Sequence, residues 1–402
     1  MPLGGIPMRI IEINENQYTN YQINHPSRNY KQSIEYANTK PKYKKLILGL
    51  TDNNNSSTIL GAVLILEKKL GNYKIGQVPG GFIIDYNDET LLTNFIKLLK
   101  KYLKEKKYIY ITIDLITPYK ILDKKNNLLY FNTNIIKLLH KLSFIKTNNE
   151  KSTNVILKTK LTPNEIYKKF NSNTKRNITK SLQRAITIYK DNNNDINTLL
   201  DLDNNINKKQ IIKILENFTT QNNKVEIYFA KLDPEKYLNN YRYLLKKEDD
   251  TNNKLTNIIH DINVNKSLSL ISKKLKSDTL ISTYNKEIAM ATNIFLKYPK
   301  GIVLGAILIV KNNHEIYFLD EVYNTEVSYL YSSHLIKWEI MKKYLSEGYK
   351  TFNFGNIKEE NDEKGDQLFK TGFGGKICEY VGTYDLIINK TLYKMTIPNN
   401  KK

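Results

Sequence analysis

Two related α/β domains, with a helical arm inserted in the second, are the fold that the sequence predicts. Residues 304–310 repeat residues 60–66 almost letter for letter, and each copy lies in a predicted strand flanked by another strand. Near residue 150 the alternation of strands and helices starts again. Residues 235–285 carry no strand signal and show apolar side chains at helical spacing. We therefore expect a duplicated architecture, although an apolar heptad can also recur by chance.

The first half predicts strands around one amphipathic helix. Asp88 caps this helix, which runs to about residue 106 with its leucines on one face. A strand at 108–114 ends in Asp114 and is followed by a loop that contains Pro118. The other predicted elements are a short helix at 31–36, strands at 46–50 and 58–66, a strand after the turn at Gly71, and a helix at 135–142.

The second half predicts a similar alternation, interrupted by the arm. Pro163 opens one helix, and a basic helix follows at 174–184. The arm is predicted as two antiparallel helices with a turn near 263–265. A helix at about 329–345 and an acidic loop at 359–366 come later. The predicted strands are 154–159, 225–232, 304–310, 315–319, 350–354, 379–388 and 391–395.

Charge and composition narrow the possible partners. The 402 residues carry 62 Lys and Arg against 40 Asp and Glu, a net charge of +22, which favours a nucleic acid, a phosphorylated substrate or an anionic membrane surface. The chain has only five arginines among many Lys, Asn and Ile, a bias typical of AT-rich genomes, so part of this charge is background.

Several classes of site and location are disfavoured. No apolar run approaches the ~20 residues that span a bilayer, and the N-terminus lacks a signal-peptide core, so a cytoplasmic protein is expected. The single cysteine, Cys378, excludes an internal disulfide and a multi-cysteine metal site. The five histidines show no metal-ligand spacing, so no metal is predicted.

One lysine near the C-terminus is set among aromatic residues and glycines. Lys370 lies between Phe369 and Phe373, which share one face of a helical turn, and Gly372 and Gly374 follow. Glycines let the backbone approach a ligand closely. A lysine beside such a dry wall can bind a phosphate or stabilise an oxyanion. The alternative is a helix end with a glycine stop and a solvated lysine.

Segments in this order resemble the Fem family (FemABX) of tRNA-dependent peptidoglycan aminoacyltransferases over nearly the whole chain. The similar segments are Gln32-Ser33 with Tyr36 and Lys40, residues 80–86, Ile113-Asp114, residues 175–178, 230–238, 348–355, 369–375 and 379–386. The resemblance implies two domains of the acyl-CoA N-acyltransferase (GNAT-like) fold. Domain 1 would comprise residues 1–150 joined by 383–402, and domain 2 residues 151–382, with the arm at 235–285.

The resemblance also implies a reaction. An amino acid would move from aminoacyl-tRNA to the amine of a peptidoglycan precursor stem peptide, carried on lipid II or on UDP-MurNAc-pentapeptide, to build the interpeptide bridge. The ester is already activated, so no cofactor and no ATP are expected. Lipid II as acceptor would bring the protein to the inner face of the membrane as a peripheral protein.

Roles for individual residues follow from the same resemblance. Lys370 would stabilise the oxyanion, and Asp114, at the end of its strand, would bind the acceptor or take the proton of the attacking amine, a task that the tRNA ribose hydroxyl could also perform. Lys40 would contact acceptor phosphates. The other substrate-binding residues implied are Tyr36, Asp85, Phe369, Gly372, Phe373 and Gly374, and the tRNA-binding residues are Lys175, Arg176 and Lys180.

Alternatives remain open at this stage. Lys40 could be a solvated surface lysine, Asp114 a turn or cap residue, and the basic helix a solvated face. Residues 190–223 lack an arginine that some family members use on phosphates, and residues 320–324 replace a glycine-rich loop. A GNAT-type acyl-CoA N-acyltransferase, a tRNA-dependent transferase acting on protein N-termini and a non-enzymatic RNA-binding module are the competing functions.

Overall fold

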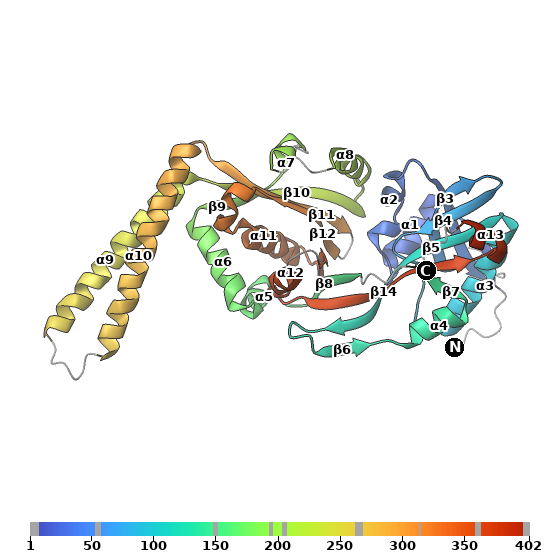
Figure 1. Ribbon diagram of the computed structural model, residues 1–402, viewed down its shortest axis with the longest axis horizontal. Helices are drawn as coiled ribbons and strands as arrows, with labels where there is room; N and C mark the ends of the chain where they lie inside the picture. The colour runs from blue at the N-terminus through green and yellow to red at the C-terminus, as the bar shows by residue number, and fades with distance from the viewer. Residues whose placement is uncertain are drawn as a thin grey trace.

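A single twisted sheet runs through the protein in the computed structural model (Figure 1). The structure describes residues 8–52, 58–147, 152–192, 196–202, 207–261, 268–312, 315–357 and 363–396. Within these residues the sheet has 14 strands in the order β1-β2-β3-β4-β5-β14-β8-β13-β12-β11-β10-β9, with β6 paired to β5 and β7 paired to β14.

The first half of the sequence supplies the strands on one side of this sheet and the helices that cover them. Its strands are β1 (Met8–Glu12), β2 (Lys44–Asp52), β3 (Ile59–Leu70), β4 (Tyr73–Val78), β5 (Tyr108–Leu122), β6 (Leu128–Phe131) and β7 (Phe144–Lys146). Its helices are α1 (Glu15–Asn24), α2 (Ile34–Asn38), α3 (Glu89–Glu105) and α4 (Asn134–Lys141), with a 3₁₀ turn η1 at Tyr30–Gln32.

The second half of the sequence supplies the remaining strands of the sheet. Its strands are β8 (Thr153–Lys158), β9 (Ile186–Lys190), β10 (Asn223–Leu232), β11 (Ile302–Asn312), β12 (Glu315–Tyr323), β13 (Thr351–Asn356) and β14 (Lys376–Ile387). Its helices are α5 (Pro163–Lys169), α6 (Ser172–Gln183), α7 (Ile196–Leu202), α8 (Lys208–Asn217), α9 (Pro234–Asp261), α10 (Leu268–Lys297), the 3₁₀ segment η3 (Thr325–Leu330), α11 (Ser332–Ser346), α12 (Glu363–Thr371) and α13 (Lys390–Thr396).

The two halves repeat one architecture. In the first, β2, β3 and β4 are antiparallel neighbours, α3 follows, and β5 returns parallel to β4. In the second, β10, β11 and β12 are antiparallel, α11 follows, and β13 returns parallel to β12. The repeated heptads lie in the equivalent strands β3 and β11. Each half also has its own apolar core, with Phe95 of α3 in one and Ile340 of α11 in the other. The expected tandem fold is confirmed.

Strand β14 joins the halves. Its first residues lie between β8 and β5, with Cys378 opposite both Asn154 and Ile121. Its later residues pair with β5 and β7, and Thr383 lies opposite Asp114 of β5. The chain after β14 stays with the first half, because α13 packs there and Tyr393 donates to Asp385 over 2.8 Å. The exact domain boundaries remain a prediction.

The arm projects from the second half as α9 and α10 side by side (Figure 1). Their 28 and 30 residues give lengths of about 42–45 Å at 1.5 Å per residue. The two helices also meet through a polar contact, in which Ser277 donates to Glu248 over 2.6 Å. At the base, Arg184 donates to both oxygens of Glu287, over 2.9 and 2.7 Å. The turn placed at 263–265 lies outside the described residues.

Four local predictions are wrong. Strand β5 does not stop at Asp114 but continues through Pro118, which a sheet tolerates here because the register with β14 shifts at this point. Strand β12 extends to Tyr323 instead of ending at 319. Residues 363–366 belong to α12 and not to a loop. The stretch 391–395 is helical, because Asn389 accepts from the backbone N–H of Leu392 at the start of α13.

No helix in the described ranges combines the length and the apolar character that a membrane crossing would require.

Candidate functional site

Lys370 is buried in the last turn of α12. Its side chain is 4% exposed, and its Nζ donates to the backbone oxygen of Asn356 over 2.6 Å and to Asp366 over 2.8 Å. A lysine ammonium has three donor positions, so these two bonds within the described chain fix the group and leave one N–H for a ligand. The solvated-lysine alternative is therefore wrong.

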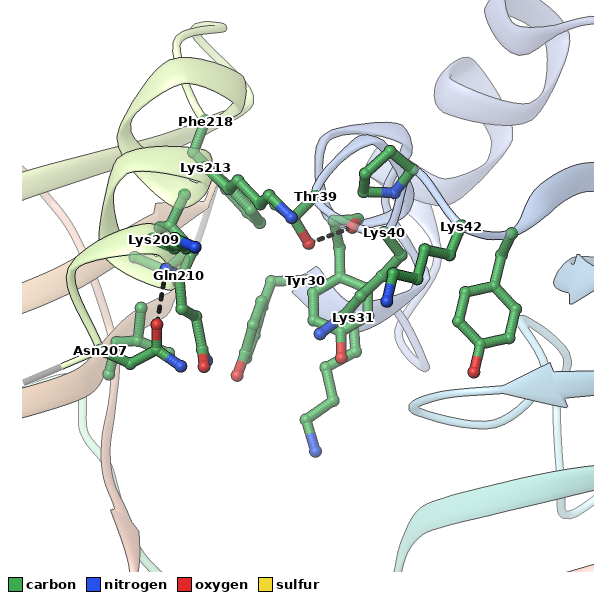
Figure 2. Close-up of a pocket in the computed structure, with 16 residues that line it drawn as sticks. Tyr30, Lys31, Thr39, Lys40, Lys42, Asn207, Lys209, Gln210, Lys213 and Phe218 are labelled. Carbon is green, nitrogen blue, oxygen red and sulfur yellow. Dashed lines mark hydrogen bonds between the residues drawn. The ribbon is translucent and has the colours of Figure 1, made fainter.

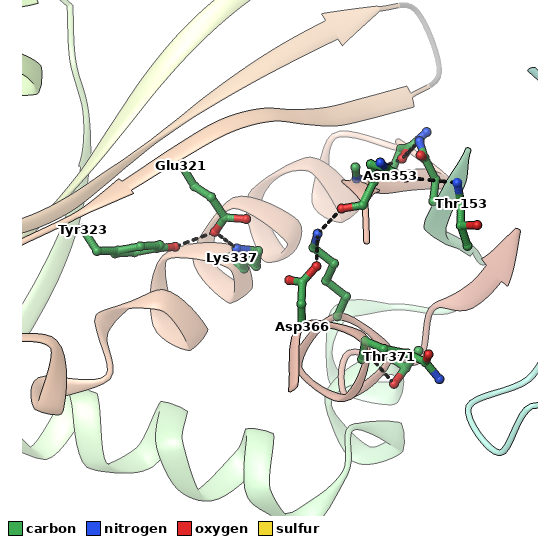
Figure 3. Close-up of polar contacts among 12 residues, drawn as sticks. Thr153, Glu321, Tyr323, Lys337, Asn353, Asp366 and Thr371 are labelled. Carbon is green, nitrogen blue, oxygen red and sulfur yellow. Dashed lines mark hydrogen bonds and ion pairs between the residues drawn. The ribbon is translucent and has the colours of Figure 1, made fainter. Parts of the chain in front are cut away.

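A second buried ion pair lies beside the first. Figure 3 shows Lys337 of α11 in contact with Glu321 of β12, and the hydroxyl of Tyr323 donates to the same carboxylate over 2.8 Å. Burial alone would raise the pKa of Glu321, but the ammonium of Lys337 holds it below its usual value. Burial lowers the pKa of Lys337, and the attraction of Glu321 opposes that change. The region therefore holds two lysine–carboxylate pairs in a largely dry setting.

Aromatic rings form the wall that separates these charges from the core. The Lys337 ammonium lies 4.6 Å from the ring centre of Phe369, and Phe369 meets Phe373 edge-on at 5.7 Å. His334 packs on Phe369 at 4.6 Å, and burial lowers its pKa to about 4, so its ring is neutral at pH 7. The predicted pairing of Phe369 and Phe373 on one face is present.

A cavity of about 310 Å³ opens next to this group. Its lining includes the carboxylates of Glu321 and Asp366, the ring of Phe369, and Ser332 and Ser333 at the start of α11. The cavity thus adjoins the helix that carries Lys370 and offers both charged and apolar walls. Lys370 is not among the described residues that line it, and its partner Asp366 lies between the two.

The glycines after Lys370 are needed for packing. A Cβ on Gly372 would lie 2.4 Å from Thr174 Oγ1, and the oxygen of Gly372 accepts from the backbone N–H of Asn171 over 3.1 Å. Gly374 has φ +88, a region that disfavours other residues. These contacts bring the N-terminus of the basic helix α6 directly against the end of α12.

The basic helix presents its charges beside Lys370's helix. Arg176 is exposed, and Lys175 and Lys180 are half-buried on the same element. Arg176 donates to Asn173 over 2.7 Å, and Lys175 to the backbone oxygen of Lys168 over 2.6 Å. Neither residue forms an ion pair with a carboxylate among the described residues, so both keep their charge for an anion.

A second cavity, of about 450 Å³, lies between the two halves and is rich in lysine (Figure 2). The Nζ of Lys40 lies 5.4 Å from the ring centre of Tyr36. Figure 2 shows Lys209 and Lys213 of α8 on the opposite side of the cavity from Lys40. None of the described residues that line the cavity is acidic. The five lysines that line it are Lys31, Lys40, Lys42, Lys209 and Lys213.

Asp114 adjoins this lysine pocket. The Nζ of Lys31 contacts Asp114 Oδ2 at 3.2 Å, and both side chains are 31% exposed. Asp114 has no direct contact with Lys370 among the described side chains. The Nζ of Lys370 bonds to Asn356, which pairs with Asn154 of β8, and Asn154 lies opposite Cys378 of β14. Thr383, which faces Asp114, lies five residues after Cys378, about 17 Å along β14. The structure therefore places Asp114 and Lys370 at separate points of the molecule.

A third cavity, of about 700 Å³, opens between the halves. Asp85 is among its lining residues, and its carboxylate accepts from the backbone N–H of Asn87 over 2.9 Å. Glu315 and Lys158 of the second half line the same space. Burial raises the pKa of Glu315 above its usual value. Residues from both halves therefore share this cleft.

Several residues of these sites were not identified from the sequence. Glu321, Lys337 and Asp366 surround Lys370 because strand β12, helix α11 and helix α12 meet there. Lys209 and Lys213 lie four apart on α8, a spacing that could have indicated a basic face.

Two other chemistries have no support in the described part of the chain. Burial raises the pKa of Cys378 to about 12, so its thiol is protonated and unreactive at neutral pH. No cluster of three or more His, Cys, Asp or Glu side chains suited to a metal ion occurs among the described residues.

Comparison with known proteins adds a family and a structural relative. The model of the FemAB family matches residues 13–398. The lipid II:glycine glycyltransferase of Staphylococcus haemolyticus is 24% identical over 92% of this chain and 91% of its own length. The aminoacyltransferase FemA of Staphylococcus aureus is 21% identical over 96% and 97%.

Solved structures agree on the fold. The crystal structure of FemX superposes with a TM-score of 0.71 at 17% identity, covering 96% of this chain and 99% of that one. A tandem GNAT protein from the clavulanic acid biosynthesis pathway gives a TM-score of 0.50 at 7% identity over 95% and 99%.

Proposed function

The chain belongs to the FemAB family, and from that premise we propose that it transfers an amino acid from aminoacyl-tRNA to an amine of a peptidoglycan precursor. The relatives named lipid II:glycine glycyltransferase and aminoacyltransferase FemA support this proposal. Lipid II or the UDP-linked muropeptide is the proposed acceptor. No cofactor is required, because the donor ester is already activated.

The observation that carries the proposal is the burial of Lys370 with two fixed partners. An ammonium held in place by Asp366 and by a backbone oxygen does not need to reorganise during the reaction. A preorganised donor of this kind stabilises the negative charge that develops on an ester oxygen. The 310 Å³ cavity beside it would receive the aminoacyl end of the donor.

The donor tRNA would lie along α6. Gly372 joins the start of this helix to the end of α12, so phosphates bound by Lys175, Arg176 and Lys180 would be held at a fixed distance from Lys370. Contacts of this kind are set by charge and shape and carry no sequence preference. The phosphate contacts would position the 3′ end of the tRNA, and the cavity would select the amino acid.

The acceptor would bind through its phosphates in the lysine pocket. Lys40, Lys209 and Lys213 surround a space with no acidic lining residue, which suits a diphosphate. Two lysines of α8 would thereby take the place of the arginine that this region lacks. The cleft between the halves, lined in part by Asp85, would hold the stem peptide.

The reaction then requires one bond to form and one to break. The neutral amine attacks the ester carbon, the tetrahedral oxyanion accepts from Lys370, and the ribose oxygen leaves with the proton. Asp114 remains the proposed acceptor-binding residue. Asp114 is paired with Lys31 and has no contact with Lys370 among the described side chains, so we assign the proton to the ribose hydroxyl.

The test is a transfer assay with defined donor and acceptor. Purified protein is mixed with charged tRNA and a lipid-linked or UDP-linked muropeptide, and the product is followed by mass spectrometry. Lys370→Met should lower the turnover number by about 10²–10³, the loss typical of one oxyanion donor. Lys364→Met, which removes an exposed lysine of the same helix α12, is the matched control and should retain activity.

Two results would contradict the proposal. Normal turnover by the folded Lys370→Met variant would remove the role of that side chain. Transfer supported by acetyl-CoA in place of charged tRNA would indicate an acyl-CoA N-acyltransferase.

A further inference from the structure

The end of the β5–β6 ribbon exposes an unusual run of side chains. All residues from 124 to 131 are exposed, and the last four are large and apolar. The exposed fractions of Leu128, Leu129, Tyr130 and Phe131 are 56, 51, 42 and 46%. A half-buried strand normally alternates apolar and polar residues, whereas both faces of β6 are apolar. We call residues 123–131 the hairpin tip.

The hairpin tip is held firmly in this exposed position. Asp123 accepts from the backbone N–H groups of Lys125 and Asn127, over 2.7 and 2.9 Å, which closes the turn. The side chain of Gln367 donates to Asn126 over 3.0 Å and ties the turn to α12. The apolar surface is therefore a fixed feature of the fold.

The location of the hairpin tip connects it with the proposed site. Tyr130 lines the 700 Å³ cleft between the halves, together with Ile121 of β5. Gln367, which holds the turn, lies on α12 three residues before Lys370. In Figure 1 the ribbon lies along the lower edge of the molecule, below β14. The hairpin tip thus stands at one end of the cleft.

We propose that the hairpin tip inserts into the headgroup region of an anionic membrane. Leucines with Tyr and Phe are the side chains that settle at the boundary between headgroups and acyl chains. Lys124 and Lys125, both exposed in the turn, would meet the anionic headgroups. The membrane contact stands on this surface alone, and its use to present a lipid-linked acceptor to the cleft rests on the proposed function.

Charge favours a membrane over a second copy of the chain. Pairing of two β6 edges would bring the lysine pairs of both copies into one interface, where like charges repel. The hairpin tip has one carboxylate, Asp123, against two lysines, so each copy would bring a net positive charge to such an interface.

Co-sedimentation of the full-length protein with vesicles tests the contact. We expect binding to vesicles of phosphatidylglycerol and phosphatidylethanolamine and much weaker binding to phosphatidylcholine. Leu128→Ser/Leu129→Ser should reduce partitioning by about tenfold or more, from the lost apolar burial. The control is Leu268→Ser/Leu275→Ser on the arm, where the two leucines are 79 and 62% exposed, and it should leave binding unchanged.

A second readout separates this inference from the proposed function. The Leu128→Ser/Leu129→Ser variant should turn over a soluble UDP-linked acceptor normally and lose activity on a lipid-linked acceptor in vesicles. Failure of the wild-type protein to bind anionic vesicles would overturn the inference and leave the transferase proposal intact. Loss of self-association, instead of vesicle binding, in this variant would assign the surface to a second copy. Vesicle binding without any transfer would contradict only the proposed function.

Discussion

Removal of the ammonium of Lys337 tests how the dry centre of the second half is stabilised. The Lys337 side chain is fully buried and that of Glu321 is 22% exposed. Loss of one partner from a buried pair costs roughly 3–5 kcal/mol, because the remaining charge is left without compensation. Since Glu321 keeps some exposure and the bond from Tyr323, we expect Lys337→Met to lower the free energy of unfolding by about 3 kcal/mol. Lys337→Met/Glu321→Gln should recover most of this loss.

The assay is urea denaturation followed by the fluorescence of the single tryptophan. Trp338 is adjacent to Lys337 on α11 and 7% exposed, so it reports unfolding of this half. The matched control is Lys342→Met on the same helix. Lys342 contacts Glu339 at 3.5 Å on the surface, and an exposed pair contributes below about 1 kcal/mol.

The pH dependence of the same experiment gives a second check. In the wild-type protein the pKa of Glu321 is lowered, so its contribution is present above the unfolded value and is lost as pH falls through the folded value. Without Lys337, burial raises that pKa, and protonation relieves the cost. The difference between wild type and Lys337→Met should therefore shrink from pH 7 to pH 4. A loss no larger than that of Lys342→Met, or one independent of pH, would refute this account.

Three further predictions concern stability and the site. Glu226 is 3% exposed and bonded to Lys190, and its pKa is lowered to about 2 because its hydrogen bonds outweigh burial. Glu226→Gln should lower the free energy of unfolding by about 3 kcal/mol at pH 7. In urea titrations the wild-type free energy of unfolding should decline from pH 4.5 to 2, and that of the variant should not. Gly372→Ala should cost about 1–3 kcal/mol in thermal unfolding, since its Cβ would lie 2.4 Å from Thr174 Oγ1. Lys213→Gln should raise KM for the acceptor several-fold with kcat nearly unchanged, as expected for a residue that binds phosphate only, whereas an altered kcat at constant KM would exclude that role.

The sequence predicts the duplicated fold because its signals are local. The heptads at 60–66 and 304–310 mark the central strand of each half, and the structure places them in β3 and β11. The pairing of Phe369 with Phe373 also follows from spacing within one helix turn. These features depend on residues a few positions apart, so periodicity alone reveals them.

What the sequence could not predict depends on contacts between distant segments. Glu321 and Lys337 lie 16 residues apart on different elements, and their contact depends on how α11 packs over β12. Pro118 indicates a loop by its type, yet the shifted register with β14 accommodates it. The sequence predicts a loop after Asp114, so it does not reveal the β5–β6 ribbon that exposes the hairpin tip.

The glycines near Lys370 serve packing, which differs from the role that the sequence suggests for them. Sequence alone suggests that they admit a ligand. In the structure a Cβ on Gly372 would meet α6, and one on Gly375 would lie 2.5 Å from Val155 Cγ1 of β8. The small residues thus let α12 approach the basic helix and the sheet at once, which buries Lys370. We therefore expect glycine at these positions to act on the proposed reaction indirectly, by setting the position of the Lys370 ammonium relative to α6.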